Sequence, residues 1–232
     1  MDPHSLTIFF PCYNDAGMIA DLVATADEVA KEFTADYEII VVDDGSEDKS
    51  REILRKLRTQ YPRLRLVFHE KNQGYGAALQ SGFRSATKDW VFYTDGDGQY
   101  DIKEARSFFG LLQNGVSLVN GYKISRHDPW PRVLTGNLYR GLMRLFFKCP
   151  VRDVNCDFRL IRRDVFDAIQ LHHTSGAICM ELVKKLEWAG FHSVDYPVHH
   201  YPRRYGKSQF FRPKPIWQTS VDLFRLWWEL RK

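Results

Sequence analysis

The feature that most constrains this chain is the alternation of short apolar runs with amphipathic stretches across its first half. Apolar runs at residues 6–10, 37–42, 64–69, 90–94 and 116–122 have the length of buried strands. The segments between them repeat apolar residues at helical spacing, which predicts helices near residues 19–33, 53–61, 74–86 and 102–113. This order is typical of βαβ units. We therefore predict an α/β fold with a mostly parallel central sheet flanked by helices.

The second half has a less regular pattern. A Pro-bounded loop at residues 127–131 precedes segments that predict helices at 133–147 and 177–189 and strands at 158–161 and 193–200. Neither a repeat nor a linker interrupts the chain, and 232 residues with 44% apolar side chains can bury one core. We expect one domain over residues 1–211 and a C-terminal helix over residues 212–232.

Polar and acidic residues follow the ends of the predicted strands. Ligands of such sheets bind outside the carboxyl ends of the strands, so these residues should meet at one edge. Asp95 and Asp97 follow the fourth strand, and residues two apart in an extended segment face the same way, with Gln99 next on that face. Mg²⁺ or Mn²⁺ is the natural occupant, although a solvated acidic turn would have the same sequence. Asp44, after the second strand, fits either a nucleoside ligand or a helix N-cap.

Basic loops supply the opposite charge. Lys123, Arg126 and Arg132 follow the fifth strand, and residues 203–208 form a basic, glycine-containing loop suited to a phosphate. Each arginine by itself also fits a solvated surface charge. A P-loop is excluded because Tyr201 stands where its first glycine would be, and the glycines at 74 and 76 lack the third glycine of a dinucleotide motif. The eight histidines show no metal-binding spacing, and we expect them to be structural.

Composition excludes other classes of protein. A net charge of +4 is too small to indicate a nucleic-acid partner by itself. The four cysteines lack a disulfide framework or CxxC spacing, which favours reduced thiols in a cytosolic protein. No signal peptide or run of about 20 apolar residues appears, so we expect a soluble or surface-bound protein. Residues 216–230 form an aromatic, basic, helix-like segment, which fits either a helix docked on its own core or an interfacial membrane helix.

Five segments in this order resemble the inverting GT-A glycosyltransferases, and among them dolichyl-phosphate mannose synthase and bacterial polyprenyl-phosphate sugar transferases. They are Pro11-Cys12-Tyr13-Asn14, Val41-Val42-Asp43-Asp44-Gly45-Ser46, Asn72-Gln73-Gly74-Tyr75-Gly76-Ala77-Ala78, Asp95-Gly96-Asp97-Gly98-Gln99 and Arg203-Arg204-Tyr205-Gly206-Lys207-Ser208. The resemblance extends from Leu6 to about Gln209. It implies a single GT-A (Rossmann-like) domain, a nucleotide-diphosphosugar donor, bound Mg²⁺ or Mn²⁺, and an isoprenoid lipid phosphate as acceptor. The expected location is the cytoplasmic face of a membrane.

The resemblance also implies roles for individual residues. The donor would be lined by Pro11, Tyr13, Asp15, Asp44, Gly74 and Asp95, and the metal would be held by Asp97 and Gln99. The acceptor phosphate would contact Lys123, Arg126, Arg132, Arg203 and Ser208. Asp97 and Asp153 are the expected catalytic residues, with Asp153 the candidate base in a segment similar to the family's Asp-x-x-Cys-Gly-Phe. Asp157 and Glu181 are the alternative bases.

Three positions depart from the family pattern. Asp15 replaces the usual Glu, Asp157 stands where the family has Gly, and Gln209 replaces a common Lys. The second of these places another carboxylate beside the candidate base. We expect hexose transfer to a polyprenyl phosphate. The alternatives are the same donor chemistry on a soluble glycan or protein, and a non-catalytic nucleotide-sugar-binding subunit. The base and sugar of the donor stay open.

Overall fold

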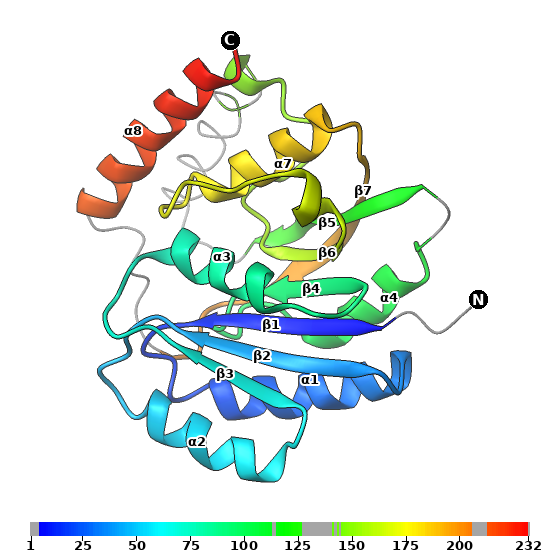
Figure 1. Cartoon of the computed structure of the whole chain (residues 1–232), viewed down its shortest axis with the longest axis vertical. Helices are drawn as coiled ribbons and strands as arrows, with labels where there is room; N and C mark the ends of the chain where they lie inside the picture. Colours follow the sequence, from blue (N-terminus) through cyan, green and yellow to red (C-terminus); the bar gives the residue numbers. More distant parts are fainter. Residues whose placement is uncertain are drawn as a thin grey trace.

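A computed structural model describes residues 5–112, 115–126, 141, 143, 145–205 and 213–231 of the protein. Its centre is a seven-stranded sheet in the order β3-β2-β1-β4-β6-β5-β7 (Figure 1). The strands are β1 (Leu6–Cys12), β2 (Tyr37–Asp43), β3 (Leu64–Phe68), β4 (Trp90–Thr94), β5 (Val116–Arg126), β6 (Phe158–Arg162) and β7 (His192–His200). Strand β6 runs antiparallel to β4 and β5, and the other neighbouring pairs are parallel. The prediction of a mostly parallel sheet is confirmed.

Helices cover both faces of this sheet (Figure 1). One face carries α1 (Ile19–Phe33), α2 (Ser50–Gln60), the 3₁₀ turn η1 (Ile102–Glu104) and α4 (Ala105–Phe109). The other face carries α3 (Tyr75–Ser85), α7 (Ile178–Trp188) and α8 (Pro213–Glu229). The short helix α6 (Val165–Ala168) follows β6. The central strands β1, β2 and β4 are buried along their whole length, because a parallel sheet between two helix layers exposes neither face.

Several element ends differ from the sequence prediction. Strand β5 continues to Arg126 instead of ending at Tyr122, because β7 pairs with it as far as His200. The helix expected at 102–113 is a 3₁₀ turn and α4, which ends at Phe109 with Gly110 as its C-cap. Of the helix expected at 133–147, residues 141, 143 and 145–147 are helical, and the rest lies outside the described residues.

Helix α8 has two apolar faces. Leu223 and Leu226 are buried in the core cluster that α3 and α7 share, which docks the helix on the domain. Trp217, Phe224 and Trp228 are 73%, 65% and 57% exposed. Packing against the domain therefore explains the leucine face of α8. The described residues do not cover the aromatic face. The expected boundary at residues 211–212 lies outside the described residues. Across the described ranges, no helix combines the length and apolarity that a bilayer crossing requires.

Candidate functional site

The loops that follow β1 and β2 are joined into one unit by Asn14. Its φ of 58° is in the left-handed region, which Asn tolerates better than most residues. The side-chain Oδ1 accepts hydrogen bonds from the backbone N–H groups of Glu47 (2.8 Å) and Asp48 (3.2 Å). The backbone N–H of Asn14 donates to Ser46 Oγ at 2.9 Å. The two strand ends are therefore fixed relative to each other before any ligand binds.

Asp44 fixes the loop that follows β3. Its Oδ1 accepts a hydrogen bond from the N–H of Gln73 (2.9 Å) and lies 2.7 Å from His69 Nδ1, and its Oδ2 accepts from the N–H of Gly74 (2.9 Å). Asp44 does not cap α2, whose N-cap is Lys49 without a side-chain bond. A nucleoside hydroxyl at this carboxylate would share oxygen atoms that already accept protein hydrogen bonds.

Gly74, the other residue expected near the donor, begins α3 with a φ of 102°. A Cβ at this position would lie 2.7 Å from the carbonyl oxygen of Thr174. The neighbouring Gly76 donates its N–H to that same oxygen at 2.8 Å. The two glycines therefore allow the backbone of α3 to pack closely against the loop before α7. Gly74 also has a positive φ, a conformation that favours glycine.

The loop after β4 carries the two acids of the Asp-x-Asp motif. Gly96 between them packs against the carbonyl oxygen of Pro11, where any Cβ would clash. Asp95 Oδ1 accepts a hydrogen bond from Tyr75 Oη at 2.8 Å. Asp97 Oδ1 accepts from the N–H of Gln99 at 3.0 Å. The loop conformation therefore depends on the end of β1 and on the start of α3.

Burial and like charge perturb the acids of these loops. Burial raises the pKa of Asp15 to about 7, and the carboxylate of Asp97 adds to the shift. The N–H of Tyr13, which is half-buried, donates to Asp15 Oδ2 at 3.1 Å. Burial raises the pKa of Asp97, which the charge of Arg203 opposes. Loss of hydration raises the pKa of Asp95 well above its usual range, and the carboxylates of Asp157 and Asp97 raise it further. The site has an excess of negative charge that a cation would relieve.

The residues of this loop fit a divalent cation. Carboxylate oxygens of Asp95 and Asp97 and the amide oxygen of Gln99 are the hard ligands that Mg²⁺ and Mn²⁺ prefer. Gln99 uses its Nε2 to donate to the carbonyl oxygen of Tyr201 at 2.9 Å. Among the residues that the structure describes, no group of three or more His, Cys, Asp or Glu side chains could hold a metal. Mg²⁺ typically binds through one or two carboxylates and takes its other ligands from substrate oxygens and water.

Two of the five expected phosphate ligands lie beside these acids. Lys123 donates through Nζ to the carbonyl oxygen of Asn155 at 2.7 Å, and its charge lowers the pKa values of Asp95 and Asp97. Arg203 donates through Nη2 to Asp97 Oδ2. Arg126 ends β5, but its side chain is outside the described part of the chain, as are Arg132 and Ser208.

The three candidate bases occupy different surroundings. Asp153 is 2% exposed; its Oδ1 accepts from the N–H of Asn155 (3.2 Å), and its Oδ2 has no hydrogen-bond partner. The position of Asp157 is set by the antiparallel register of β4 and β6. This register pairs Thr94 with Phe158 and so brings Asp157 to the level of Asp95.

Glu181 is fully buried in α7. It accepts hydrogen bonds from the N–H groups of His172 and His173 and from Lys185 Nζ. These contacts hold the loop against which Gly74 and Gly76 pack. Glu181 is thus occupied in holding the loop before α7, whereas Asp153 keeps one carboxylate oxygen without a hydrogen-bond partner.

Sequence reasoning missed a buried arginine beneath the site. Arg159 in β6 has no exposed surface; it donates through Nε to Asn120 Oδ1 (2.7 Å) and through Nη1 to Tyr93 Oη and Asp157 Oδ1. Nη2 donates to the carbonyl oxygen of Val154 at 2.5 Å. The signal was a charged residue inside the apolar run of residues 158–161. A buried charge in such a run requires internal partners.

Comparison with known proteins supplies an independent result. The sequence model of glycosyl transferase family 2 matches residues 7–170. Glycosyltransferase AglD of Haloferax volcanii is 26% identical over 239 residues, with 97% of this chain and 37% of that protein covered. An undecaprenyl-phosphate 4-deoxy-4-formamido-L-arabinose transferase of Enterobacter sp. is 26% identical over 209 residues, covering 89% of this chain and 63% of that protein.

Among solved structures, the fold is similar to a mannosyltransferase, PcManGT, of Pyrobaculum calidifontis in complex with GDP-Man and Mn²⁺. The TM-score is 0.64 at 20% identity, with 95% of this chain and 64% of the other covered. This similarity supports the α/β fold. The chain spans less than two thirds of each of these three proteins.

Proposed function

The chain belongs to glycosyl transferase family 2, and on that premise we propose that it moves a hexose from a nucleotide-diphosphosugar to a polyprenyl phosphate. The observation that carries the proposal is the convergence of carboxylates from two strand ends, Asp15 after β1 and Asp95 and Asp97 after β4, with the cations Lys123 and Arg203. A diphosphate ester with a divalent ion matches this mixture of charges. The names of the relatives point the same way: one transfers to undecaprenyl phosphate, and one structure holds GDP-Man with Mn²⁺.

In the proposed reaction, an oxygen of the acceptor phosphate attacks the anomeric carbon of the donor. A new carbon–oxygen bond forms as the bond to the nucleoside diphosphate breaks on the opposite face, and the configuration inverts. Bound Mg²⁺ or Mn²⁺ would offset the charge that develops on the departing diphosphate. Asp97 and Gln99 would hold that ion, and Asp95 would support the donor. Pro11, Tyr13, Asp15, Asp44 and Gly74 would form the nucleoside side of the site.

The acceptor side needs cations more than it needs a base. An acceptor phosphate is already ionised near neutral pH, so alignment and charge neutralisation dominate the barrier. Lys123 and Arg203 would supply that charge, together with Arg126 and Arg132, and the Ser208 hydroxyl would donate a hydrogen bond to the phosphate. Asp153 is the proposed base, and the unpartnered Oδ2 of its buried carboxylate supports it. If Asp153 acts as the base, Asp153→Asn lowers kcat more than Asp157→Asn does.

Radiolabelled product identifies the acceptor. The protein is incubated with membranes, Mn²⁺ and labelled GDP- or UDP-hexoses, and label is counted in organic and aqueous extracts. We expect label in the organic extract, its loss in Asp97→Asn, and its retention in Asp167→Asn, which changes an exposed acid on α6. Label confined to a water-soluble glycan or protein would favour the alternative acceptor. Donor binding without turnover would favour a non-catalytic subunit.

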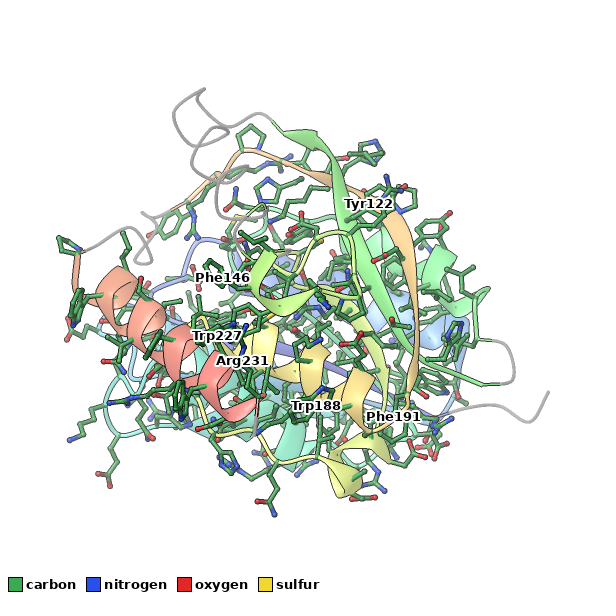
Figure 2. The ribbon with its side chains drawn as sticks, turned by 90° about the horizontal axis from the view of Figure 1, so that it is seen from above. Tyr122, Phe146, Trp188, Phe191, Trp227 and Arg231 are labelled. Atoms are coloured by element: carbon green, nitrogen blue, oxygen red, sulfur yellow. The ribbon has the colours of Figure 1, made fainter. Side chains whose placement is uncertain are left out.

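We place the reaction at a membrane surface, on its cytoplasmic side, and the exposed face of α8 supports contact with the membrane. Trp217, Phe224 and Trp228 lie on this face, and Phe146 contacts Trp227 from the neighbouring helical residues, with ring centroids 6.1 Å apart. Arg231 lies over the Trp227 ring at 3.7 Å (Figure 2). Aromatic rings flanked by arginine suit the headgroup region of a bilayer.

Vesicle flotation tests this placement. We expect wild-type protein to float with vesicles that contain anionic lipid, and the variant Trp217→Ser/Phe224→Ser/Trp228→Ser to remain in solution. Trp188→Ser is the matched control, because Trp188 is 59% exposed and lies in α7 instead of α8. Equal flotation of the triple variant and wild type would refute the membrane role of α8.

A further inference from the structure

Arg203 bridges acids from two strand ends. It lies in the segment after β7, and its side chain is 25% exposed. Nη2 donates to Asp97 Oδ2, and Nη1 is 4.0 Å from Asp15 Oδ1. Both carboxylates are buried. The guanidinium is therefore the positive partner of two acids that would otherwise repel each other.

The rest of this segment is fixed over the same loops. The N–H of Tyr201 donates to the carbonyl oxygen of Gln99 at 2.8 Å, and Gln99 Nε2 donates back to the carbonyl oxygen of Tyr201. The ring of Tyr205 covers Gly17, where any Cβ would clash with it. Contacts on both sides of Arg203 thus hold its guanidinium at the acids. A side chain placed this way is built into the site and is not a freely solvated charge.

Both carboxylate oxygens of Asp97 already contact groups of the protein. Its Oδ1 accepts the N–H of Gln99, and its Oδ2 accepts Arg203. A divalent ion that binds Asp97 approaches the oxygen atom that Arg203 holds, and it also repels the guanidinium. Repulsion between two positive charges at one oxygen atom therefore favours one cation at a time at this carboxylate.

We propose that Arg203 is the resident counter-ion of the cation site, and that it leaves Asp97 when a divalent cation binds. This inference rests on the proposed function, which places Mg²⁺ or Mn²⁺ at Asp97. The displaced guanidinium keeps its charge and becomes available to an acceptor phosphate. Binding of the cation then releases Arg203 to bind the acceptor phosphate. By thermodynamic linkage, bound cation favours binding of the phosphate, and bound phosphate favours binding of the cation.

Binding of Mn²⁺ without donor or acceptor tests the competition. Free Mn²⁺ is measured by electron paramagnetic resonance in titrations of wild type, Arg203→Gln and Arg204→Gln. Arg204 is the matched control, because it is the adjacent arginine and is exposed. We expect Arg203→Gln to bind Mn²⁺ about tenfold more tightly than wild type, within the usual range of coupling between two sites, and Arg204→Gln to match wild type.

The outcomes separate the inference from the function on which it rests. If wild type binds Mn²⁺ and Arg203→Gln binds it equally or more weakly, the competition is refuted while the cation site stands. If none of the three proteins binds Mn²⁺, both the cation site and the competition fail.

A second measurement uses wild-type protein and so does not depend on the folding of a variant. Phenylglyoxal modifies accessible guanidinium groups, and mass spectrometry compares Arg203 with Arg204 in the same peptide. We expect Mn²⁺ to raise the modification of Arg203 severalfold relative to Arg204. An unchanged ratio at saturating Mn²⁺ would show that the ion pair with Asp97 persists, which would overturn the inference.

Discussion

The two halves of the sheet build the site in different ways. Around β1, β2 and β4, short loops after parallel strands deliver acids to one edge, and neighbouring loops hold each other, as Asn14 holds residues 46–48. Around β5, β6 and β7, the cations and the buried Arg159 make contacts with distant segments, such as that of Arg203 with Asp97, 106 residues away. The first half supplies Asp15, Asp95 and Asp97, and the second half supplies the cations Lys123 and Arg203 that lie beside them.

The acids of the first half and the buried arginine of the second half affect folding stability in different ways. Acids with raised pKa values are destabilising when ionised, so their presence serves ligand binding more than folding. Arg159 is fully buried and each of its guanidinium nitrogens donates a hydrogen bond, so its removal takes a donor from several buried groups. Substitution of the acids that follow β1 and β4 should therefore mainly lower activity, whereas substitution of Arg159 should mainly lower stability.

The largest expected effect is on Arg159. Arg159→Met removes the buried guanidinium that donates to Asp157 and Asn120, and breaking such a buried ion pair costs about 3–5 kcal/mol. Urea unfolding measures the loss. The double variant Asp157→Asn/Arg159→Met should lose less than the sum of the single losses. Additive losses would show that the two side chains are not coupled.

The next largest effect is expected for Asp97, and it should be on activity instead of stability. Asp97→Asn should lower kcat/KM by about a hundredfold to a thousandfold, the range for loss of one charge-stabilising group. The free energy of unfolding without metal should change little, because burial already disfavours the ionised carboxylate. A strongly destabilised but active variant would reverse the assignment of Asp97 to function.

Substitution of Gly96 tests how rigidly the first half holds its acids. A Cβ at this position meets the carbonyl oxygen of Pro11, so Gly96→Ala should cost about 1–3 kcal/mol of stability, as overpacking does. The control is Gly110→Ala, where the nearest atom to a Cβ is 3.6 Å away. Differential scanning calorimetry of both variants measures the contrast, and equal Tm values would contradict it.

The smallest effect concerns pH. Asp15 has a folded-state pKa of about 7 against an ordinary value of 3.8. The folded state therefore binds more protons than the unfolded state between these values, and stability falls as pH rises through this window. We expect a loss on the order of 1 kcal/mol between pH 5 and pH 8, measured by urea unfolding with EDTA. Asp15→Asn should flatten this dependence, and an unchanged slope would assign it to other groups.

The sequence predicted the layers and the acidic edge. The strands over β1, β2 and β4 and the helices α1 and α3 were predicted within about two residues, because apolar periodicity reports burial directly. The sequence did not predict the antiparallel β6, the extension of β5 to Arg126 or the bond of Tyr75 to Asp95. Each of these depends on a partner that is distant along the chain.

The order of residues along the chain is enough to say which chemical groups follow which strands, since strand periodicity and short loops are local properties. The pairing of charges needed the folded chain: Arg203 contacts Asp97, and the β4–β6 register brings Asp157, which accepts from Arg159, to the level of Asp95. The physical reason is that electrostatic pairing depends on distance and burial. Strand order and register set both, and neither leaves a periodic pattern in the sequence.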